Sequence, residues 1–340
     1  MTRGGFVEIG SEFWMEDYVN TIDSNLFSDE IAILLSGRSA LDYVCRDSLI
    51  KSILLPSYCC TTMIEPFLRN GVNVSFYDVD IDAISYPSND TSDAVLVIDY
   101  FGFKNVEMER IAKKAFKERK IVIYDKTHRL SSNIAIEKYS TYSISSYRKW
   151  MYCNFATVRK FKENFCIEQP KKCNDEYLFL RNEAAQLKHS YILNETTDKT
   201  QFLQSFQKAN ELLQNDYVGY AGVPIAFNKK AIVKQRRDNA QTLINGMLSI
   251  PNAKLWKTVI AEDDTPLFLP ILLKDADERK RLRDYLVRKN IYCPIHWPQN
   301  ELTYKTPQSL YQRELSLICD QRYGTMDMEK QISAIKEFFR

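Results

Sequence analysis

The first half of the chain alternates short apolar runs with helical stretches, and this alternation limits the possible folds more than any other feature. The apolar runs predict strands at 52–55, 74–79, 94–100, 120–125 and 142–145. The sequence between them predicts helices at 39–50, 60–70 and 105–118. Strands that alternate with helices form a largely parallel sheet with crossover helices. Because continuous apolar strands are buried on both faces, we predict an α/β fold built on such a sheet.

The second half of the chain predicts a helical region followed by a smaller α/β unit. From about 176 to 248 the pattern is helical, and a strand is expected at 265–274. Asp275 is a suitable N-cap for the amphipathic helix that follows this strand. We therefore predict a large sheet domain, residues 1–230, and a small C-terminal domain, residues 231–340.

Composition excludes several classes of protein. The 46 Lys and Arg residues nearly balance the 44 Asp and Glu residues, so the net charge of +2 does not indicate a nucleic-acid partner. No apolar run has the length of about 18 residues that a membrane span requires, and the N-terminus lacks the order of a signal peptide. We therefore expect a cytoplasmic protein with free thiols. With only three histidines, far apart, a metal site is not expected.

Phosphate-binding loops rich in glycine are also missing. The chain has ten glycines and contains neither GxGxxG nor GxxxxGK[ST]. The usual dinucleotide and P-loop devices need glycine where the backbone approaches phosphate. Any phosphate site must therefore be built in another way.

Three features with chemical potential follow one another in order along the chain. Ser36-Gly37-Arg38 opens a helix, Asp125 ends an apolar strand, and Lys149 follows another strand. Alone, each has an ordinary structural explanation: a helix cap, a strand-end cap and a solvated lysine. Together they supply what pyridoxal phosphate needs, namely a helix N-terminus for its phosphate, a carboxylate for its pyridine nitrogen and an amine for a Schiff base. The carboxyl ends of sheet strands could bring the three together.

The ordered motifs of the chain resemble those of one enzyme family. The segments are SGRSALDYV, LLPSYCCTTMIEPF, VSFYDVD, IYDKTH, SISSYRKW, NIYCPIHWP and LSLICDQRYGTMDM. In this order they resemble the DegT/DnrJ/EryC1/StrS family of fold-type-I pyridoxal-phosphate aminotransferases, best known for aminating nucleotide-linked keto sugars. The resemblance runs over nearly the whole chain. It implies a large, mostly parallel sheet domain, a smaller C-terminal α/β domain and a homodimer whose sites are completed by the partner subunit.

The resemblance implies catalytic roles at matching positions. Lys149 would carry the cofactor as a Schiff base and then move the substrate proton. Arg148 would favour the neutral amine by like-charge repulsion if it points inward; the alternative is an arginine that faces solvent or a phosphate. Asp125 would pair with the pyridinium nitrogen, and His128 would lie near the cofactor ring and its phenolic oxygen. A buried structural histidine is the alternative at 128.

The resemblance also implies a set of cofactor-binding positions. Those for the phosphate are Gly37, Arg38 and Ser39 in the first helix, and Ser145 or Ser146 in the strand before the lysine. Arg38 stands where the family commonly has threonine and could form a charge-assisted pair with the phosphate.

Three further positions flank the cofactor ring and the entrance. Tyr58 or Cys60 lies where an aromatic side chain usually stacks on the ring, and a cysteine there would replace stacking with a polarizable sulfur. His296 would approach the entrance and bind substrate, with a structural role as the alternative.

The chain departs from the family pattern in ways that affect the substrate more than the cofactor. The segment after the lysine lacks the usual glycine-rich turn, and the partner-subunit contribution is not recognisable near 218–228.

The leading hypothesis is an aminotransferase that moves an amino group from glutamate or a similar donor to a keto sugar, nucleotide-linked, for bacterial polysaccharide or secondary-metabolite biosynthesis. Two alternatives stay open. One is a pyridoxal-phosphate lyase or dehydratase on the same scaffold, since a fold does not fix a reaction. The other is a non-catalytic ligand-binding relative, although such a protein has little need for Lys149.

Overall fold

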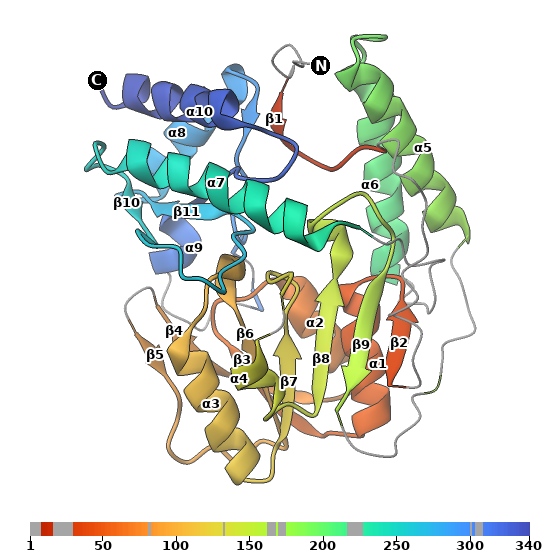
Figure 1. Ribbon diagram of the computed structural model, residues 1–340. Coiled ribbons are helices and arrows are strands. Elements are labelled where there is room, and N and C mark those ends of the chain that lie inside the picture. Colours follow the sequence, from red (N-terminus) through yellow and green to blue (C-terminus); the bar gives the residue numbers. More distant parts are fainter. Residues whose placement is uncertain are drawn as a thin grey trace.

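An eight-stranded sheet forms the centre of the larger part of the molecule (Figure 1). The computed structural model describes residues 8–15, 30–80, 83–131, 133–161, 168, 175–215, 227–299, 301–302 and 309–340. The strand order is β2-β9-β8-β7-β6-β3-β4-β5. The strands are β2 (Ile31–Leu34), β3 (Ser52–Pro56), β4 (Asn73–Val79), β5 (Ile84–Ser85), β6 (Ala94–Ile98), β7 (Ile121–Asp125), β8 (Tyr142–Ser146) and β9 (Ala156–Lys160).

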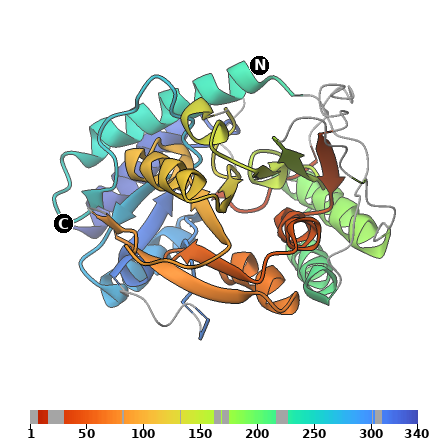
Figure 2. The same cartoon turned by 90° about the horizontal axis from the view of Figure 1, so that it is seen from below.

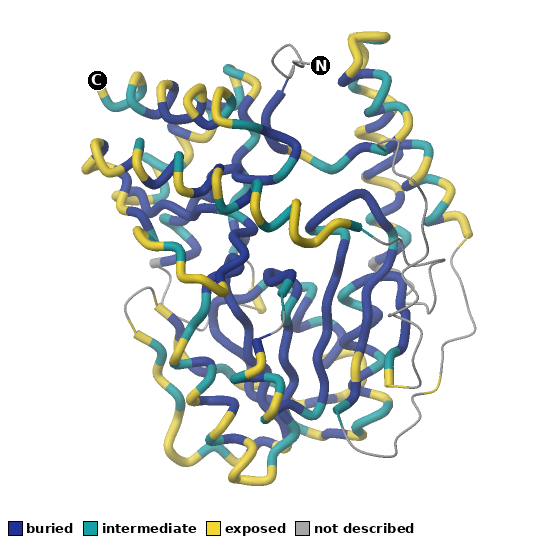
Figure 3. The backbone as a smooth tube through the Cα atoms, in the orientation of Figure 1, coloured by how far each residue is buried: buried dark blue, intermediate teal, exposed yellow. Residues whose placement is uncertain are grey.

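The five central strands, from β8 to β4, are parallel, whereas β9 and β5 run antiparallel to their neighbours. The predicted largely parallel sheet is therefore confirmed. All five residues of β6, β7's last four and all five of β8 are buried, and Figure 3 shows the sheet as the core of this part. The parallel strands β3, β6, β7 and β8 present their carboxyl ends at one edge, where parallel sheets bind ligands.

Helices connect these strands as the alternation predicts. They are α1 (Gly37–Ser48), α2 (Thr61–Arg69), α3 (Val106–Lys117) and the short α4 (Ile134–Glu137). The predicted ranges 39–50, 60–70 and 105–118 differ from the first three by one or two residues at each end. Helix ends fray and are defined no better than this.

The strand predicted at 94–100 is too long. The chain leaves the sheet after Ile98 and forms a 3₁₀ turn, Tyr100–Gly102. Gly102 has a φ of +85°, and a Cβ there would lie 1.9 Å from the carbonyl oxygen of Thr265. The backbones of two distant segments touch at this point, so the strand has no room to continue.

The C-terminal part contains a small antiparallel sheet, β10-β11-β13, flanked by helices. Its strands are β10 (Lys254–Leu255), β11 (Leu269–Leu272) and β13 (Glu314–Leu317), and its helices are α7 (Lys229–Met247), α8 (Ala276–Arg288), α9 (Ser309–Arg313) and α10 (Thr325–Phe338). The Asp275 cap is confirmed, since its side chain accepts a 2.8 Å hydrogen bond from Glu278 N. The predicted boundary at 230/231 falls at the start of α7 and stays a prediction.

The sequence predicts strands at 265–274 and at 291–297, and both are shorter in the structure. The strand at 265–274 is confined to β11, and after it β12 covers only Ile291–Tyr292. β12 pairs in parallel with β1 (Ile9–Gly10), which brings the N-terminal segment against the C-terminal part. The strand does not continue through Pro294, because proline has no N–H to donate to a neighbouring strand.

A helical hairpin, α5 (Asp175–Ile192) and α6 (Thr200–Asn215), lies beside the large sheet (Figures 1 and 2). The two helices pack along each other. Among the described residues, the helical region predicted at 176–248 is confirmed in α5, α6 and a third helix at Lys229–Met247, with a break at 193–199. Residues 216–226, which include most of 218–228, lie outside the described residues. No helix among the described residues has the length and apolar character of a membrane span.

Candidate functional site

A cavity of about 390 Å³ lies at the carboxyl ends of β6, β7 and β8. We call it the sheet cavity. Its wall includes Gly37, Arg38, Asp125, His128 and Lys149. The three features that the sequence analysis combined therefore reach one cavity, because parallel strands end at the same edge of the sheet.

The N-terminus of α1 forms one end of the sheet cavity. Ser36 is the N-cap: its Oγ accepts a 3.2 Å hydrogen bond from Ser39 N. Ser36, Gly37 and Arg38 line the cavity, whereas Ser39 is buried and its Oγ lies 3.1 Å from that of Ser36. The first N–H groups of a helix have no partner within it, so this end can receive an anion.

Arg38 adds a positive charge to this end. Its Nε is buried and has no hydrogen-bond partner among the described residues. Glu65 Oε2 lies 3.8 Å from this Nε, an ion-pair distance rather than that of a hydrogen bond. A buried guanidinium N–H without an acceptor is costly, so an anion at this end would satisfy it.

Asp125 is the last residue of β7 and lies on the same cavity wall. It is buried, and its Oδ1 accepts a 2.8 Å hydrogen bond from Thr127 N. Burial raises the pKa of this carboxyl, while the bonds from Thr127 and the charge of Lys149 act against the rise. A cationic partner in the cavity would stabilise its ionised form.

Lys149 and Arg148 end the 3₁₀ turn Tyr147–Lys149 that follows β8. Both side chains are half-buried and both line the sheet cavity. Burial lowers the pKa of Lys149, and the charge of Arg148 lowers it further, against the opposing influence of Cys60, Glu12 and Asp125. The amine of Lys149 is therefore more often neutral than that of a solvated lysine.

His128 is buried and neutral. Its Nδ1 accepts a 3.2 Å hydrogen bond from Phe101 N, which leaves the proton on Nε2. Burial and the charge of Lys149 lower its pKa to about 3. Its ring stacks on Trp297, with centroids 5.8 Å apart and planes 23° apart. His128 can therefore donate a hydrogen bond into the sheet cavity but carries no charge.

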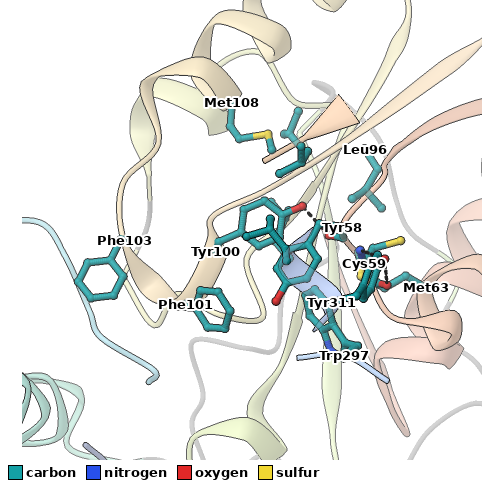
Figure 4. Packing of buried hydrophobic residues seen from close by; sticks show 14 of the residues in the cluster. Tyr58, Cys59, Met63, Leu96, Tyr100, Phe101, Phe103, Met108, Trp297 and Tyr311 are labelled. Carbon is teal, nitrogen blue, oxygen red and sulfur yellow. Dashed lines mark hydrogen bonds between the residues drawn. The ribbon is translucent and has the colours of Figure 1, made fainter. Parts of the chain in front are cut away.

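The sequence left two choices open, Tyr58 or Cys60 and Ser145 or Ser146, and in each pair one residue lines the sheet cavity and the other does not. Cys60 lines the sheet cavity, with its Sγ 2.9 Å from Thr62 Oγ1. Tyr58 does not line it; Figure 4 shows Tyr58 among buried aromatic side chains, and its hydroxyl donates to the carbonyl oxygen of His296. Ser146 lines the cavity and Ser145 does not.

Some residues of the sheet cavity were not found from the sequence. Trp297 stacks on His128, and α6 contributes Asn210 and Leu213. Trp297 could have been noticed, because it follows His296 in a motif already singled out. The α6 residues carry no motif, and only the packing of the hairpin brings them to the wall.

A second cavity, also of about 390 Å³, shares Arg148 and Lys149 with the first. We call it the arginine cavity, because its wall also includes Arg236, Arg283 and Arg322. His296 lines this cavity and not the sheet cavity. The amine of Lys149 therefore borders both spaces.

The N-terminal segment closes part of the arginine cavity. Arg322 donates to the carbonyl oxygens of Ser11 and Glu12 and pairs with Asp320 at 2.8 Å. Burial opposes ionisation of Glu12, but the charges of Arg181, Arg148 and Lys149 outweigh it and lower its pKa to about 2. The field at this place therefore favours carboxylates and other anions.

Comparisons with known proteins identify the fold. No protein-family model matches the chain, and no curated protein matches its sequence. Among solved structures, the chain is similar to PseC from Helicobacter pylori, an aminotransferase involved in the biosynthesis of pseudoaminic acid, with a TM-score of 0.66 and 14% identity over 98% of this chain and 99% of that one. It is also similar to a DegT/DnrJ/EryC1/StrS aminotransferase from Brucella abortus, with a TM-score of 0.58 and 13% identity over 91% and 85%.

A third similar structure is NtdA from Bacillus subtilis with its bound cofactor PMP, with a TM-score of 0.58 and 14% identity over 90% of this chain and 73% of that one. At these identities the likeness concerns the fold. The predicted fold, that of a fold-type-I pyridoxal-phosphate transferase, is confirmed.

Proposed function

Since the chain has the fold of these aminotransferases, we propose that it belongs to the DegT/DnrJ/EryC1/StrS family and acts as a pyridoxal-phosphate-dependent aminotransferase. The amino group would pass from an amino acid such as glutamate to a keto sugar, nucleotide-linked, in the biosynthesis of a bacterial polysaccharide or secondary metabolite. One observation carries the proposal: Asp125, Lys149 and the N-terminus of α1 with Arg38 share one cavity.

The residues present fit this cofactor. Its phosphate would lie at the N-terminus of α1, where the buried Nε of Arg38 lacks a hydrogen-bond partner among the described residues. Its pyridine nitrogen would meet Asp125, whose buried carboxyl gains from a cation. Its aldehyde would meet the amine of Lys149. Ser146, Cys60 and His128 line the same space and would contact it as the resemblance implies.

When bound, pyridoxal phosphate supplies an aldehyde that reacts with amines and a ring that withdraws electrons from the adjacent C–H bond. Lys149 Nζ would take the proton from the substrate carbon and return it, which requires a partly neutral amine. Burial keeps it so, and like-charge repulsion from Arg148 adds to the effect. His128, neutral with its proton on Nε2, would donate a hydrogen bond without adding charge.

The sugar acceptor is supported by the sequence motifs and by the likeness to PseC, an aminotransferase involved in the biosynthesis of pseudoaminic acid. The binding of substrate is assigned to the arginine cavity, which His296 lines and which Lys149 borders. We also propose that the protein is a homodimer and lies in the cytoplasm.

The proposal is tested on purified protein supplied with pyridoxal phosphate, glutamate and a panel of nucleotide-linked keto sugars. We expect release of 2-oxoglutarate and an amino sugar detected by mass spectrometry. Lys149→Ala should lower the rate by about 10³-fold or more. Lys126→Ala, which removes a lysine paired with Glu137 at 3.1 Å, should keep it.

Borohydride reduction followed by peptide mapping checks the attachment site. The label should lie on Lys149, and a label on another lysine would refute the assignment. A lyase or dehydratase would instead release an unsaturated or dehydrated product without 2-oxoglutarate. A ligand-binding protein would produce neither.

A further inference from the structure

Three buried side chains form a hydrogen-bonded row that ends at the arginine cavity. Glu314 and Ser316 lie two residues apart on β13, so both point to one face of the strand. Ser316 Oγ donates to Glu314 Oε1 at 2.5 Å and lies 2.9 Å from His296 Nδ1. Glu314 and Ser316 are fully buried, and His296 is 4% exposed. The row thus connects a buried carboxyl with a ring on the cavity wall.

The backbone fixes which oxygen of Glu314 faces the row. The N–H of His296 donates to Glu314 Oε2 at 2.7 Å. A proton on this carboxyl must therefore lie on Oε1, the oxygen that Ser316 contacts. The serine hydroxyl has a single proton and cannot donate in both directions at once.

Two proton arrangements of the row follow from this constraint. When Glu314 is ionised, Ser316 donates to it and accepts from His296 Nδ1–H, so that Nε2 is a free base. When Glu314 is protonated, it donates to Ser316, which donates to Nδ1, so that Nε2 carries the proton. The state of Glu314 thus sets the tautomer of His296 without charging the ring.

The ring is placed to exchange this proton with the arginine cavity. His296 lines that cavity together with Lys149. Its Nδ1 is taken by Ser316, so Nε2 is the ring nitrogen that remains for a ligand. Burial and the charge of Lys149 lower the pKa of His296. His128, whose ring centroid lies 5.8 Å from that of His296, adds to the effect, so the imidazolium form of His296 is disfavoured.

We propose that His296, Ser316 and Glu314 are a proton relay that accepts the proton of the incoming amino group at His296 Nε2 and holds it on Glu314 Oε1. In this transfer the donor's ammonium group loses one proton to Nε2, the Nδ1 proton passes to Ser316 Oγ, and the serine proton passes to Glu314 Oε1. The donor becomes a free amine and the carboxylate becomes neutral. The reverse movement returns the proton to the product. This role rests on the proposed aminotransferase function, because it supplies the unprotonated amine that such a reaction needs.

The surroundings of Glu314 suit a reversible proton store. Burial raises its pKa to about 8, while Ser316, the backbone of His296 and Arg279 of α8 act in the opposite direction. Tyr58 and Cys293 also face this carboxyl. Near neutral pH the neutral carboxyl is therefore in excess, but an ionised fraction is present that can accept the proton, and the neutral form can return it.

The relay is tested directly by NMR of protein labelled with ¹⁵N-histidine. The chain has only three histidines, so the spectrum is simple, and His296→Asn identifies the signal of interest. From about pH 6 to about pH 10 we expect His296 to change from the Nε2–H to the Nδ1–H tautomer with a midpoint near 8, the pKa of Glu314. Glu314→Gln and Ser316→Ala should each abolish this change, and His189 on α5 should not respond to either substitution. A wild-type tautomer that stays constant over the range, or an imidazolium signal, would overturn the relay.

The pH dependence of the rate of amino-group transfer in Glu314→Gln and Ser316→Ala is a second test of the relay. Both variants should transfer amino groups about 10- to 100-fold more slowly at neutral pH, and should approach the wild-type rate at alkaline pH, where solvent deprotonates the donor. A loss of rate that is equal at all pH values would indicate a merely structural role and overturn the proposal. The NMR result does not depend on catalysis. A tautomer change without transamination would therefore reject the proposed function alone.

Discussion

The sheet cavity and the arginine cavity share Arg148 and Lys149, but they are built in different ways. Most of the sheet cavity comes from residues 36–149, at places where a strand ends or a helix begins. The arginine cavity joins residues 11–13, one arginine each from α7 and α8, and residues 318–322. Local sequence signals therefore describe the first cavity, and long-range packing makes the second.

The two cavities also differ in what they can hold. Among the described residues, the sheet cavity combines a helix N-terminus, two arginines (Arg38 and Arg148), one buried carboxyl and one amine, a set that matches a phosphorylated aromatic cofactor. In the part of the chain that the structure describes, the arginine cavity has five cationic wall residues against the carboxyls of Glu12 and Asp320. Its excess of positive charge suits an anionic substrate. If this division holds, substitutions in one cavity should change cofactor affinity and those in the other should change substrate affinity.

Among the substitutions that separate cofactor binding from substrate binding, the largest effect is expected in the sheet cavity, at Arg38. Arg38→Gln should weaken the binding of pyridoxal phosphate by about 10- to 100-fold, since hydrogen bonds to charged groups contribute about 1.5–3 kcal/mol. Arg46→Gln is the matched control: it lies on the same helix, 69% exposed and paired with Asp42 at 2.7 Å. Titration of the apoprotein with cofactor, followed by absorbance, measures both. Equal affinities for the two variants would show that the phosphate does not lie at this end of the cavity.

A smaller effect is expected at the shared wall. Arg148 lowers the pKa of Lys149, so Arg148→Met should raise that pKa and reduce the neutral fraction of the amine at any given pH. The rate at which pyridoxal phosphate labels Lys149 should fall at neutral pH and recover at higher pH. The pH profile of labelling, mapped to Lys149 by mass spectrometry, measures this shift. A shift to lower pH would contradict the assigned direction of the charge effect.

Much of the fold was predictable because its signals are local. The apolar runs before Asp125 and Val79 and the caps Ser36 and Asp275 each gave an element within two residues of its observed bounds. Strand β9, which lies between β2 and β8, was not predicted. The segment after Lys149 has no glycine or proline to mark a turn, so the antiparallel return of the chain leaves no sequence signal.

The sequence also predicted that Asp125 and Lys149 would come together, because both follow strands that end at one edge of the sheet, and the structure places both on one cavity wall. Their catalytic roles stay predictions. The choice between Tyr58 and Cys60 was left open, because only packing decides which of them faces the cavity. The structure turns Tyr58 toward Tyr311 and Trp297, with ring centroids 5.0 and 5.1 Å away. The roles of Arg236 and Arg322 could not be predicted. They lie 86 residues apart, and only the close approach of α7 to the segment after β13, where Arg236 Nε donates to Gln321 at 2.7 Å, brings them together.

The smallest effect is expected in the arginine cavity, where a substitution should change the affinity for substrate and not that for the cofactor. Arg283 is exposed on α8 and lines the arginine cavity, so Arg283→Gln should raise the KM for an anionic substrate by about three- to tenfold and leave the affinity for pyridoxal phosphate unchanged. Arg281→Gln, on the same helix and outside the wall, should change neither quantity. Because the site is open to solvent, the difference between the two variants should shrink as salt is added. If Arg283→Gln instead weakens cofactor binding, the cavities do not divide cofactor from substrate.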